Sequence, residues 1–232
     1  MCGRYSLTVP PEEFAQHFGL SDVPDLEPRY NVAPTQDMPV IRLPEGASRE
    51  AVTMRWGLVP FSAASPDGAA RMINARSETV AEKPSFRWAF QKTRCLVPAD
   101  GFYEWKRTGG VKQPYHITLR GRGLFAFAGL WDEWTSRDGD RLLSYTVLTT
   151  EPNDLMRSIH DRMPVILPPE RYAEWLDPGS NPQGIREILR PVPADALLAT
   201  AVSDRVNSVR NEGPSLIVPV PEPLELDLFS SD

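Results

Sequence analysis

Hydrophobic and polar positions form short runs along this chain, and turn-forming residues separate the runs. The 24 prolines and 15 glycines recur at short intervals. β-branched and aromatic residues fill the intervening stretches of about five to eight positions, the usual length of a strand. The pattern predicts strands at residues 3–7, 39–43, 52–58, 95–97, 101–106, 115–119, 124–131, 144–149 and 165–167. So many short strands favour a barrel or a sandwich.

The helices that the pattern predicts are short and lie between the strands. Residues 11–18 begin with proline and carry acids in the first turn, and both features favour a helix N-terminus. Similar signals predict helices at residues 85–91, 152–159, 169–175 and 183–189. We therefore expect an α+β fold with one domain over residues 1–220, built of mostly antiparallel, barrel-like β-sheet with short peripheral helices. An acidic tail at residues 221–232 is expected to follow it.

Composition limits the cellular compartment and the cofactors that we expect for this domain. The chain has 232 residues, of which 41% are hydrophobic, and this is enough for one compact core. No apolar run approaches the roughly 20 residues that span a bilayer, and the first residues lack the apolar segment of a secretory signal. We expect a cytoplasmic protein in which Cys2 and Cys95 are free thiols. The three histidines show no ligand spacing, so no metal and no other cofactor is predicted.

The net charge of -6 argues at first against a nucleic-acid partner, because DNA-binding proteins usually carry a basic excess. The predicted tail holds four of the acids and no basic residue, so 27 acidic residues stand against 25 basic ones in the remainder. A nearly neutral body can carry a local arginine cluster. Its expected consequence is modest affinity with little long-range steering.

Cys2 is the first candidate for chemistry. Methionine aminopeptidases remove Met1 when the second residue is as small as cysteine, which exposes a thiol and a primary amine on adjacent carbons. The pKa of an α-amine is about 7.7 to 8.0, so a useful fraction is unprotonated near neutral pH. Such an amine condenses with an aldehyde to a Schiff base, and the thiol then closes a thiazolidine ring. The alternative is that Cys2 is a small apolar residue that starts the first strand.

Three further polar residues are candidates, each with a structural alternative. His160 is predicted at a helix-to-strand turn, where it could exchange protons or simply favour the helix dipole. Glu104 shares a strand face with Phe102, so it is either a desolvated proton carrier or a surface carboxylate paired with Lys106. Asn74 could orient a sugar or phosphate oxygen, or it could cap a helical turn.

Arginines accompany three of these positions. Arg4, Arg76 and Arg162 each lie within two residues of Cys2, Asn74 or His160, as a site that holds a phosphodiester backbone would require. Trp56 could offer a ring face for base stacking, although packing in the core is the commoner fate of a tryptophan.

Seven ordered sequence blocks resemble one family. They are MCGRY at residues 1–5, YNVAP at 30–34, RWGLVP at 55–60, NARSET at 74–79, RCLVPADGFYEW at 94–105, FAGLW at 127–131 and HDRMP at 160–164. Together they resemble the SOS-response-associated peptidase (SRAP) family over nearly the whole body of the chain. Blocks in this order and spacing are far more specific than any one of them.

The resemblance implies a single mixed α/β domain that binds single-stranded DNA and junctions between single and double strands, and we expect a monomer. It implies a covalent thiazolidine link between Cys2 and an abasic site, which shields the lesion. Asn74 would orient the amine or the sugar, Glu104 would shuttle protons, and His160 would help to open the deoxyribose ring. DNA contacts are implied for Arg4, Asn31, Trp56, Arg76 and Arg162.

Two other functions stay open at this stage. A cysteine hydrolase of the N-terminal-nucleophile type would use the Cys2 thiol to attack an amide, with the amine as base. A non-covalent module for single-stranded DNA would show salt-sensitive affinity and no adduct that survives denaturation.

Overall fold

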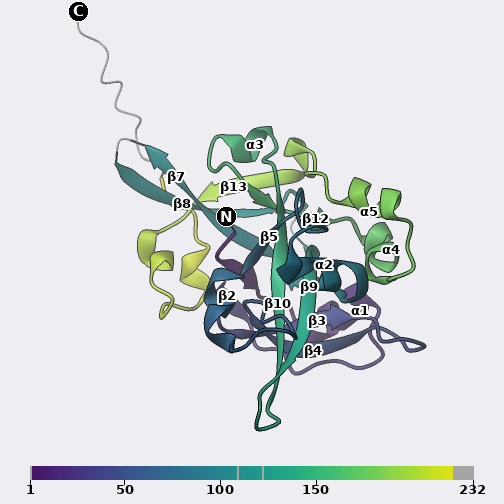
Figure 1. Cartoon of the computed structure of the whole chain (residues 1–232). Helices are drawn as coiled ribbons and strands as arrows, with labels where there is room; N and C mark the ends of the chain where they lie inside the picture. Colours follow the sequence, from purple (N-terminus) through teal and green to yellow (C-terminus); the bar gives the residue numbers. More distant parts are fainter. Residues whose placement is uncertain (1, 109, 122, 222–232) are drawn as a thin grey trace, which may run out of the picture.

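The computed structural model describes residues 2–108, 110–121 and 123–221. The strands in these residues form two sheets (Figure 1). Their bounds are β1 (Tyr5–Leu7), β2 (Arg29–Val32), β3 (Asp37–Arg42), β4 (Glu50–Trp56), β5 (Asn74–Arg76), β6 (Arg94–Ala99), β7 (Gly101–Thr108), β8 (Val111–Leu119), β9 (Phe125–Thr135), β10 (Arg141–Thr150), β11 (Met163–Pro164), β12 (Ile166–Leu167) and β13 (Leu197–Ala201).

The larger sheet closes on itself. Its strand order is β11-β10-β4-β3-β6-β9-β12, with β5 added beside β10. Because β9 also pairs with β10, the strands β10, β4, β3, β6 and β9 form a closed ring of hydrogen-bonded neighbours. Within this ring only the β10–β4 pair is parallel in the described residues. The expected barrel-like, mostly antiparallel α+β fold is therefore confirmed.

The smaller sheet holds the N-terminal strand against this barrel. Its order is β13-β8-β7-β1-β2, and β1 pairs with β7 through Tyr5 opposite Phe102. The Tyr5 hydroxyl lies 2.8 Å from the Tyr145 hydroxyl of β10, and the Tyr5 ring packs 5.2 Å from Trp56. All four side chains are fully buried. The described residues that precede β1, 2–4, are thus fixed between the two sheets.

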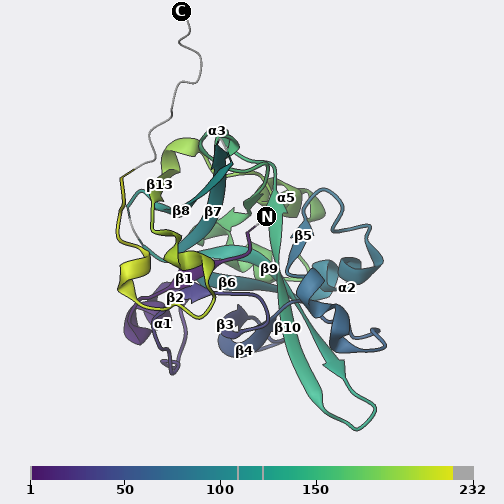
Figure 2. The same ribbon diagram turned by 90° about the vertical axis from the view of Figure 1, so that its left-hand side faces the viewer.

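Short helices surround the sheets, and Figure 2 shows them at the periphery while the β9–β10 hairpin extends away from the body. The α-helices are α1 (Pro11–Phe18), α2 (Pro84–Lys92), α3 (Asp154–Arg157), α4 (Tyr172–Leu176) and α5 (Pro182–Ile188). The 3₁₀ helices are η1 (Pro66–Arg71), η2 (Pro169–Arg171), η3 (Ala194–Ala196), η4 (Asp204–Asn207) and η5 (Pro214–Leu216). α1 begins at a proline, buries Phe14 and Phe18, and ends at Gly19 in the left-handed conformation with φ 65°.

All the predicted strands and helices have a counterpart, but several elements are missing from the prediction. The strands β2, β5, β11 and β13 were not predicted. The capping role considered for Asn74 is wrong, because Asn74 begins β5 and pairs in parallel with Val147 of β10. The helix predicted at residues 152–159 is a single turn, with the Asn153 side chain accepting a hydrogen bond from the Met156 amide at 2.9 Å.

Three further expectations concern the chain as a whole. Cys2 and Cys95 are both buried free thiols, as expected. No helix within the described ranges is long and apolar enough to cross a membrane. The tail predicted at residues 221–232 lies outside the described residues, except for its first position.

Candidate active site around Cys2

Cys2 lies just before β1 and is fully buried. Its Sγ donates a long hydrogen bond of 3.9 Å to the carbonyl oxygen of Arg4. Burial raises the pKa of the Cys2 thiol well above its ordinary value, and the negative charge of Glu104 raises it further. The thiol is therefore protonated at neutral pH and needs a local proton acceptor before it can react as a nucleophile.

Asn74 contacts Cys2 directly from the neighbouring sheet. The parallel pairing of β5 with β10 places its side chain so that Nδ2 donates a 2.8 Å hydrogen bond to the Cys2 carbonyl oxygen. Its other polar atom, Oδ1, is buried and accepts no hydrogen bond from any described residue. Leaving a buried acceptor unpaired costs about 1–3 kcal/mol. This oxygen can accept a hydrogen bond from an N–H or O–H group that enters the site.

Glu104 is a buried carboxyl group on β7, opposite Tyr115 of β8. Its side chain is 2% exposed, so the alternative of a surface carboxylate is wrong. Burial raises the pKa of Glu104, while the positive charge of a protonated His160 opposes part of this rise. Glu104 therefore holds a proton more readily than an ordinary glutamate does, as a general acid requires.

His160 occupies the loop between α3 and β11. Its Nδ1 lies 3.1 Å from the backbone N–H of Arg162 and 2.8 Å from Oδ1 of Asp161. An unprotonated Nδ1 accepts from the amide, whereas a protonated Nδ1 donates to the carboxylate. Nδ1 therefore has a partner within hydrogen-bond distance in either state, and these two contacts fix the position of the ring.

The fold brings these four residues into one cluster from four separate segments. Asn74 is hydrogen bonded to Cys2, Cys2 interacts electrostatically with Glu104, and Glu104 interacts electrostatically with His160. An amide, a thiol, a carboxyl group and an imidazole thus surround the start of β1. No group of three or more His, Cys, Asp or Glu side chains in the described ranges is arranged to hold a metal ion.

Two of the predicted phosphate-binding arginines flank an acidic residue that sequence reasoning missed. Arg162 donates to both carboxylate oxygens of Glu78, at 2.6 and 2.9 Å, and to the carbonyl oxygen of Thr149 at 2.7 Å. The hydrogen bond from Arg162 lowers the pKa of Glu78, and the charge of Arg76 adds to the effect. Arg76 itself is exposed. Glu78 lies two residues after Arg76, and this spacing was the sequence feature that could have indicated its contact with the arginines.

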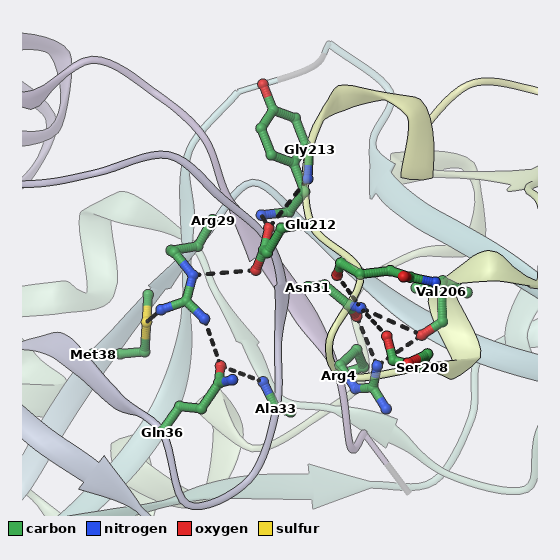
Figure 3. Close-up of polar contacts among 12 residues, drawn as sticks. Arg4, Arg29, Asn31, Ala33, Gln36, Met38, Val206, Ser208, Glu212 and Gly213 are labelled. Carbon is green, nitrogen blue, oxygen red and sulfur yellow. Dashed lines mark hydrogen bonds and ion pairs between the residues drawn. The ribbon is translucent and has the colours of Figure 1, made fainter.

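Arg4 and Asn31 belong to a buried network (Figure 3). Nη1 of Arg4 donates to Asn31 Oδ1 at 2.7 Å and to the Val206 carbonyl oxygen at 2.8 Å. Nδ2 of Asn31 donates to the carbonyl oxygens of Ser208 and Asn211 at 3.0 and 2.9 Å. These contacts connect Arg4, just before β1, and Asn31 of β2 to the segment after β13. The DNA contacts of Arg4 and Asn31 stay predictions, because their described hydrogen bonds go to protein atoms.

Trp56 does not offer a face for base stacking, which corrects the expectation. The side chain is fully buried, Nε1 donates to the Ile73 carbonyl oxygen at 2.9 Å, and the ring stacks on Tyr145 with an interplanar angle of 8°. It is a core residue. Among the residues that the structure describes, the exposed aromatic side chains are Phe61 and Trp88 instead, at 56% and 48% exposure, and neither was singled out in the sequence.

Comparison with known proteins identifies the family. The model of the family described as SOS response associated peptidase (SRAP) matches residues 1–209, a span that includes the whole cluster around Cys2. This chain belongs to the SRAP family. The resemblance carried by the seven sequence blocks is therefore confirmed.

Several SRAP relatives are similar over most of their length. "Abasic site processing protein YoqW" of Bacillus subtilis (strain 168) is 44% identical over 222 residues, covering 94% of this chain and 99% of the relative. "Abasic site processing protein HMCES" of Xenopus tropicalis is 31% identical over 265 residues, covering 95% of this chain and 78% of the relative. A crystal structure of a protein from Bacteroides thetaiotaomicron superposes with a TM-score of 0.85 at 28% identity, covering 95% of this chain and 100% of that one.

Proposed function

We propose that this SRAP-family chain processes abasic sites in single-stranded DNA by attaching to them covalently through Cys2. The observation that carries the proposal is the cluster of Asn74, Glu104 and His160 around the residue that becomes the N-terminus when Met1 is removed. The names of the relatives YoqW and HMCES support the substrate. The product is a thiazolidine, which shields the lesion from cleavage and from error-prone bypass.

The first step exposes the aldehyde of the lesion. An abasic deoxyribose is mostly a closed hemiacetal, and ring opening needs a proton on the ring oxygen while the C1 hydroxyl loses its own. His160 is suited to deliver that proton, since Nδ1 has a partner in both protonation states. The Oδ1 atom of Asn74 is suited to accept a hydrogen bond from the attacking Cys2 amine. The nitrogen lone pair then forms a bond to C1 while the C=O electron pair moves to oxygen, and transfer of one proton from nitrogen to that oxygen gives a carbinolamine.

The second step removes water and closes the ring. Protonated Glu104 donates to the carbinolamine hydroxyl, which leaves as water while a C=N bond forms. The Glu104 carboxylate then accepts the thiol proton of Cys2 as Sγ bonds to C1, and the C=N electron pair returns to nitrogen. One water is lost and no oxidant is needed. The raised pKa of the thiol keeps Sγ protonated until this carboxylate forms beside it.

Arginine side chains are proposed to hold the phosphates next to the reacting sugar. Arg76 is exposed and can bind a phosphate directly. Arg162 can bind a phosphate only after its hydrogen bonds to Glu78 are broken. The proposed partners are single-stranded DNA with an abasic site and junctions of single with double strands. The proposed active form is a monomer in the cytoplasm that associates with the nucleoid when it is bound to DNA.

Intact mass spectrometry of the Met1-free protein tests the proposal. After incubation with an oligonucleotide that carries one abasic site, the mass should rise by the mass of the oligonucleotide less one water, in denaturant. Cys2→Ala should give no such stable adduct, while Cys95→Ala, which removes the other buried thiol, should react like the wild type. A stable adduct formed by Cys2→Ala would contradict the assigned nucleophile.

The family description also supports a second candidate, peptidase activity. In its simplest form the Cys2 thiol attacks the Met1 carbonyl carbon, the Met1–Cys2 amide bond breaks as the Cys2 nitrogen takes up the thiol proton and leaves as the free amine, and water hydrolyses the resulting thioester to release methionine and restore the thiol. This reaction would prepare the amine for DNA capture. Cell-free synthesis without methionine aminopeptidase is the test, because self-processing predicts a wild-type product that lacks Met1 and a Glu104→Gln product that retains it. Retention of Met1 by both would exclude this candidate.

A further inference from the structure

Phe61 and Trp88 form an exposed pair of aromatic rings, here called the aromatic pair. Their side chains are 56% and 48% exposed, and the ring centroids lie 6.0 Å apart at an interplanar angle of 62°. The other large hydrophobic side chains exposed in the described ranges are all valines. Aromatic rings are usually buried, so two adjacent rings that face solvent indicate a contact surface.

The loop that carries Phe61 is held in place. The Phe61 amide donates to Oδ2 of the buried Asp132 at 2.9 Å, and Trp134 Nε1 donates to the Ala63 carbonyl oxygen at 2.8 Å. Both partners belong to β9, which forms part of the barrel. The Phe61 ring is therefore presented from a fixed backbone, and a ligand that stacks on it loses little entropy in ordering the protein.

Trp88 projects from the outer side of a basic helix. Phe86, Ala89 and Phe90 form the inner side of α2, and Trp88 lies opposite them. Lys92 lies one turn further along the same side as Trp88, and the sequence of α2 contains no acidic residue. In a protein with a net charge of -6, this stretch complements a phosphate backbone.

The aromatic pair lies within reach of the reactive cluster but is separate from it. The loop that carries Phe61 starts and ends beside Asn74, since the Leu58 amide donates to the Met72 carbonyl oxygen at 3.1 Å. Five residues of chain join Phe61 to Asn74 through this hydrogen bond, and they span at most about 18 Å when extended. Adding roughly 5 Å for the hydrogen-bonded crossing places the aromatic pair within a few nucleotides of a lesion bound at Cys2.

We propose that the aromatic pair stacks against unpaired bases of the single-stranded DNA that flanks the abasic site. The inference rests on the proposed function for its substrate class. Every base has a π-face, so stacking of this kind tolerates any flanking sequence. Lys92 would neutralise phosphate beside the stacked base. The aromatic pair would thus supply affinity that the abasic nucleotide, which has no base, cannot supply.

Length-dependent binding of a non-reactive oligonucleotide tests the inference. Tetrahydrofuran replaces the abasic sugar, since it has no aldehyde, and affinities are measured by fluorescence anisotropy in a Cys2→Ala background. Trp88→Ala and Phe61→Ala should each weaken binding of an oligonucleotide of about 15 nucleotides by about tenfold. Both should leave binding of a trinucleotide centred on the tetrahydrofuran unchanged. Trp88→Phe, which keeps a ring, should recover most of the affinity.

Val111→Ala serves as the matched control, because it truncates another exposed apolar side chain, one that is 57% exposed at the β7–β8 turn. It should bind both oligonucleotides like the parent. Unchanged affinity of Trp88→Ala for the long oligonucleotide would overturn the inference. An equal loss of affinity for the long and the short oligonucleotide would also overturn it, as would a loss of affinity that appears only when duplex DNA flanks the site. The Cys2→Ala protein used in these measurements cannot form the thiazolidine. The binding result therefore does not depend on whether the mass experiment detects covalent capture.

Discussion

At the scale of single residues, the buried carboxyl group of Glu104 is predicted to lower the stability of the fold while it serves proton transfer. Burial raises the pKa of its carboxyl group, so the folded chain binds the proton more tightly than the unfolded chain does. The stabilisation is complete below the unfolded pKa of about 4.3 and is lost as pH rises through the raised folded value. Towards neutral pH the buried carboxyl group of Glu104 therefore lowers the stability of the fold.

Glu104→Gln should accordingly raise the melting temperature near pH 7 by about 2–4 °C, the shift that about 1 kcal/mol gives in a domain of this size. Below pH 4 the gain should shrink, because the wild-type carboxyl group is then protonated in both states. The same variant should form the adduct with abasic DNA about 100-fold more slowly, since it cannot transfer a proton. Thermal melts at several pH values and single-turnover kinetics measure the two effects. A variant that reacts at the wild-type rate would exclude Glu104 as the proton carrier.

Glu78 is predicted to compete with DNA for Arg162. The bidentate contact places a carboxylate where a phosphate would bind, and the lowered pKa of Glu78 keeps that carboxylate ionised. Glu78→Gln should raise affinity for single-stranded DNA about three- to tenfold. It should also make the slope of log affinity against log salt more negative by about 0.7, the value for one additional phosphate contact. Anisotropy titrations over a range of salt concentrations measure both.

Glu133→Gln is the matched control for this prediction. Glu133 also binds an arginine in bidentate fashion, since Arg141 donates to its two oxygens at 2.6 Å each. That pair joins β9 to β10 within their hairpin, apart from the cluster around Cys2. Equal gains in DNA affinity for the two variants would mean that general charge explains the effect, and not release of Arg162.

At the scale of elements, the regular strands were predictable and the short polar ones were not. β6 has an apolar run after Arg94 and β9 begins with an apolar run, and their sequence alone indicates their structure. β5 has only three residues, Asn74, Ala75 and Arg76, and no intrinsic preference for a strand. It is a strand because it pairs with β10, whose partner residues lie more than 70 positions away in the sequence. A local pattern cannot report such a contact.

The same limit explains the outcome for Trp56 and Glu78. The type of residue at position 56 suits both base stacking and core packing, and only the surrounding Tyr5 and Tyr145 decide between them. The Glu78–Arg162 contact joins two segments 84 residues apart. Cys2, Asn74, Glu104 and His160 were candidates from their chemistry and sequence context, and the motif resemblance implied their roles. Their proximity is a property of the fold.

Closure of the barrel depends on close approach of β6 and β9 at Gly129. A Cβ atom there would lie 2.6 Å from Val97 Cγ2 and 2.8 Å from Cys95 Sγ, with the Cys95 carbonyl oxygen at 3.3 Å. These neighbours are fully buried, so they have no free space to move into. Gly129→Ala should destabilise the protein by about 1–3 kcal/mol, as overpacking of a core does. Thermal unfolding measures the loss.

Gly121→Ala is the control for Gly129→Ala, because a Cβ atom at Gly121 meets no atom within 4 Å. It should leave the melting temperature unchanged within about 1 °C. If Gly129→Ala were as stable as Gly121→Ala, the backbones of β6 and β9 would have room to separate. The tight β6–β9 contact would then not be a requirement for closing the ring.

At the scale of the whole molecule, weak attraction to DNA and irreversible capture should complement each other. The net charge is -6, and two arginines near the candidate site, Arg4 and Arg162, already bind protein atoms. Few phosphates are then neutralised on binding. We expect the initial association with single-stranded DNA to be modest in affinity and to show a shallow salt slope, no steeper than about -3, which corresponds to about four phosphates.

Time courses of adduct formation at several salt concentrations, resolved on denaturing gels, test whether weak reversible association is followed by irreversible capture. At protein concentrations below saturation, the rate should fall with salt along the binding slope, because only the reversible association is electrostatic. The final yield with one abasic site per oligonucleotide should not change, since each captured lesion leaves the equilibrium. Arg76→Ala should lessen the slope by about 0.7 and reach the same yield. A yield that falls in parallel with the rate would mean that the adduct dissociates, and covalent capture would then not compensate for weak binding.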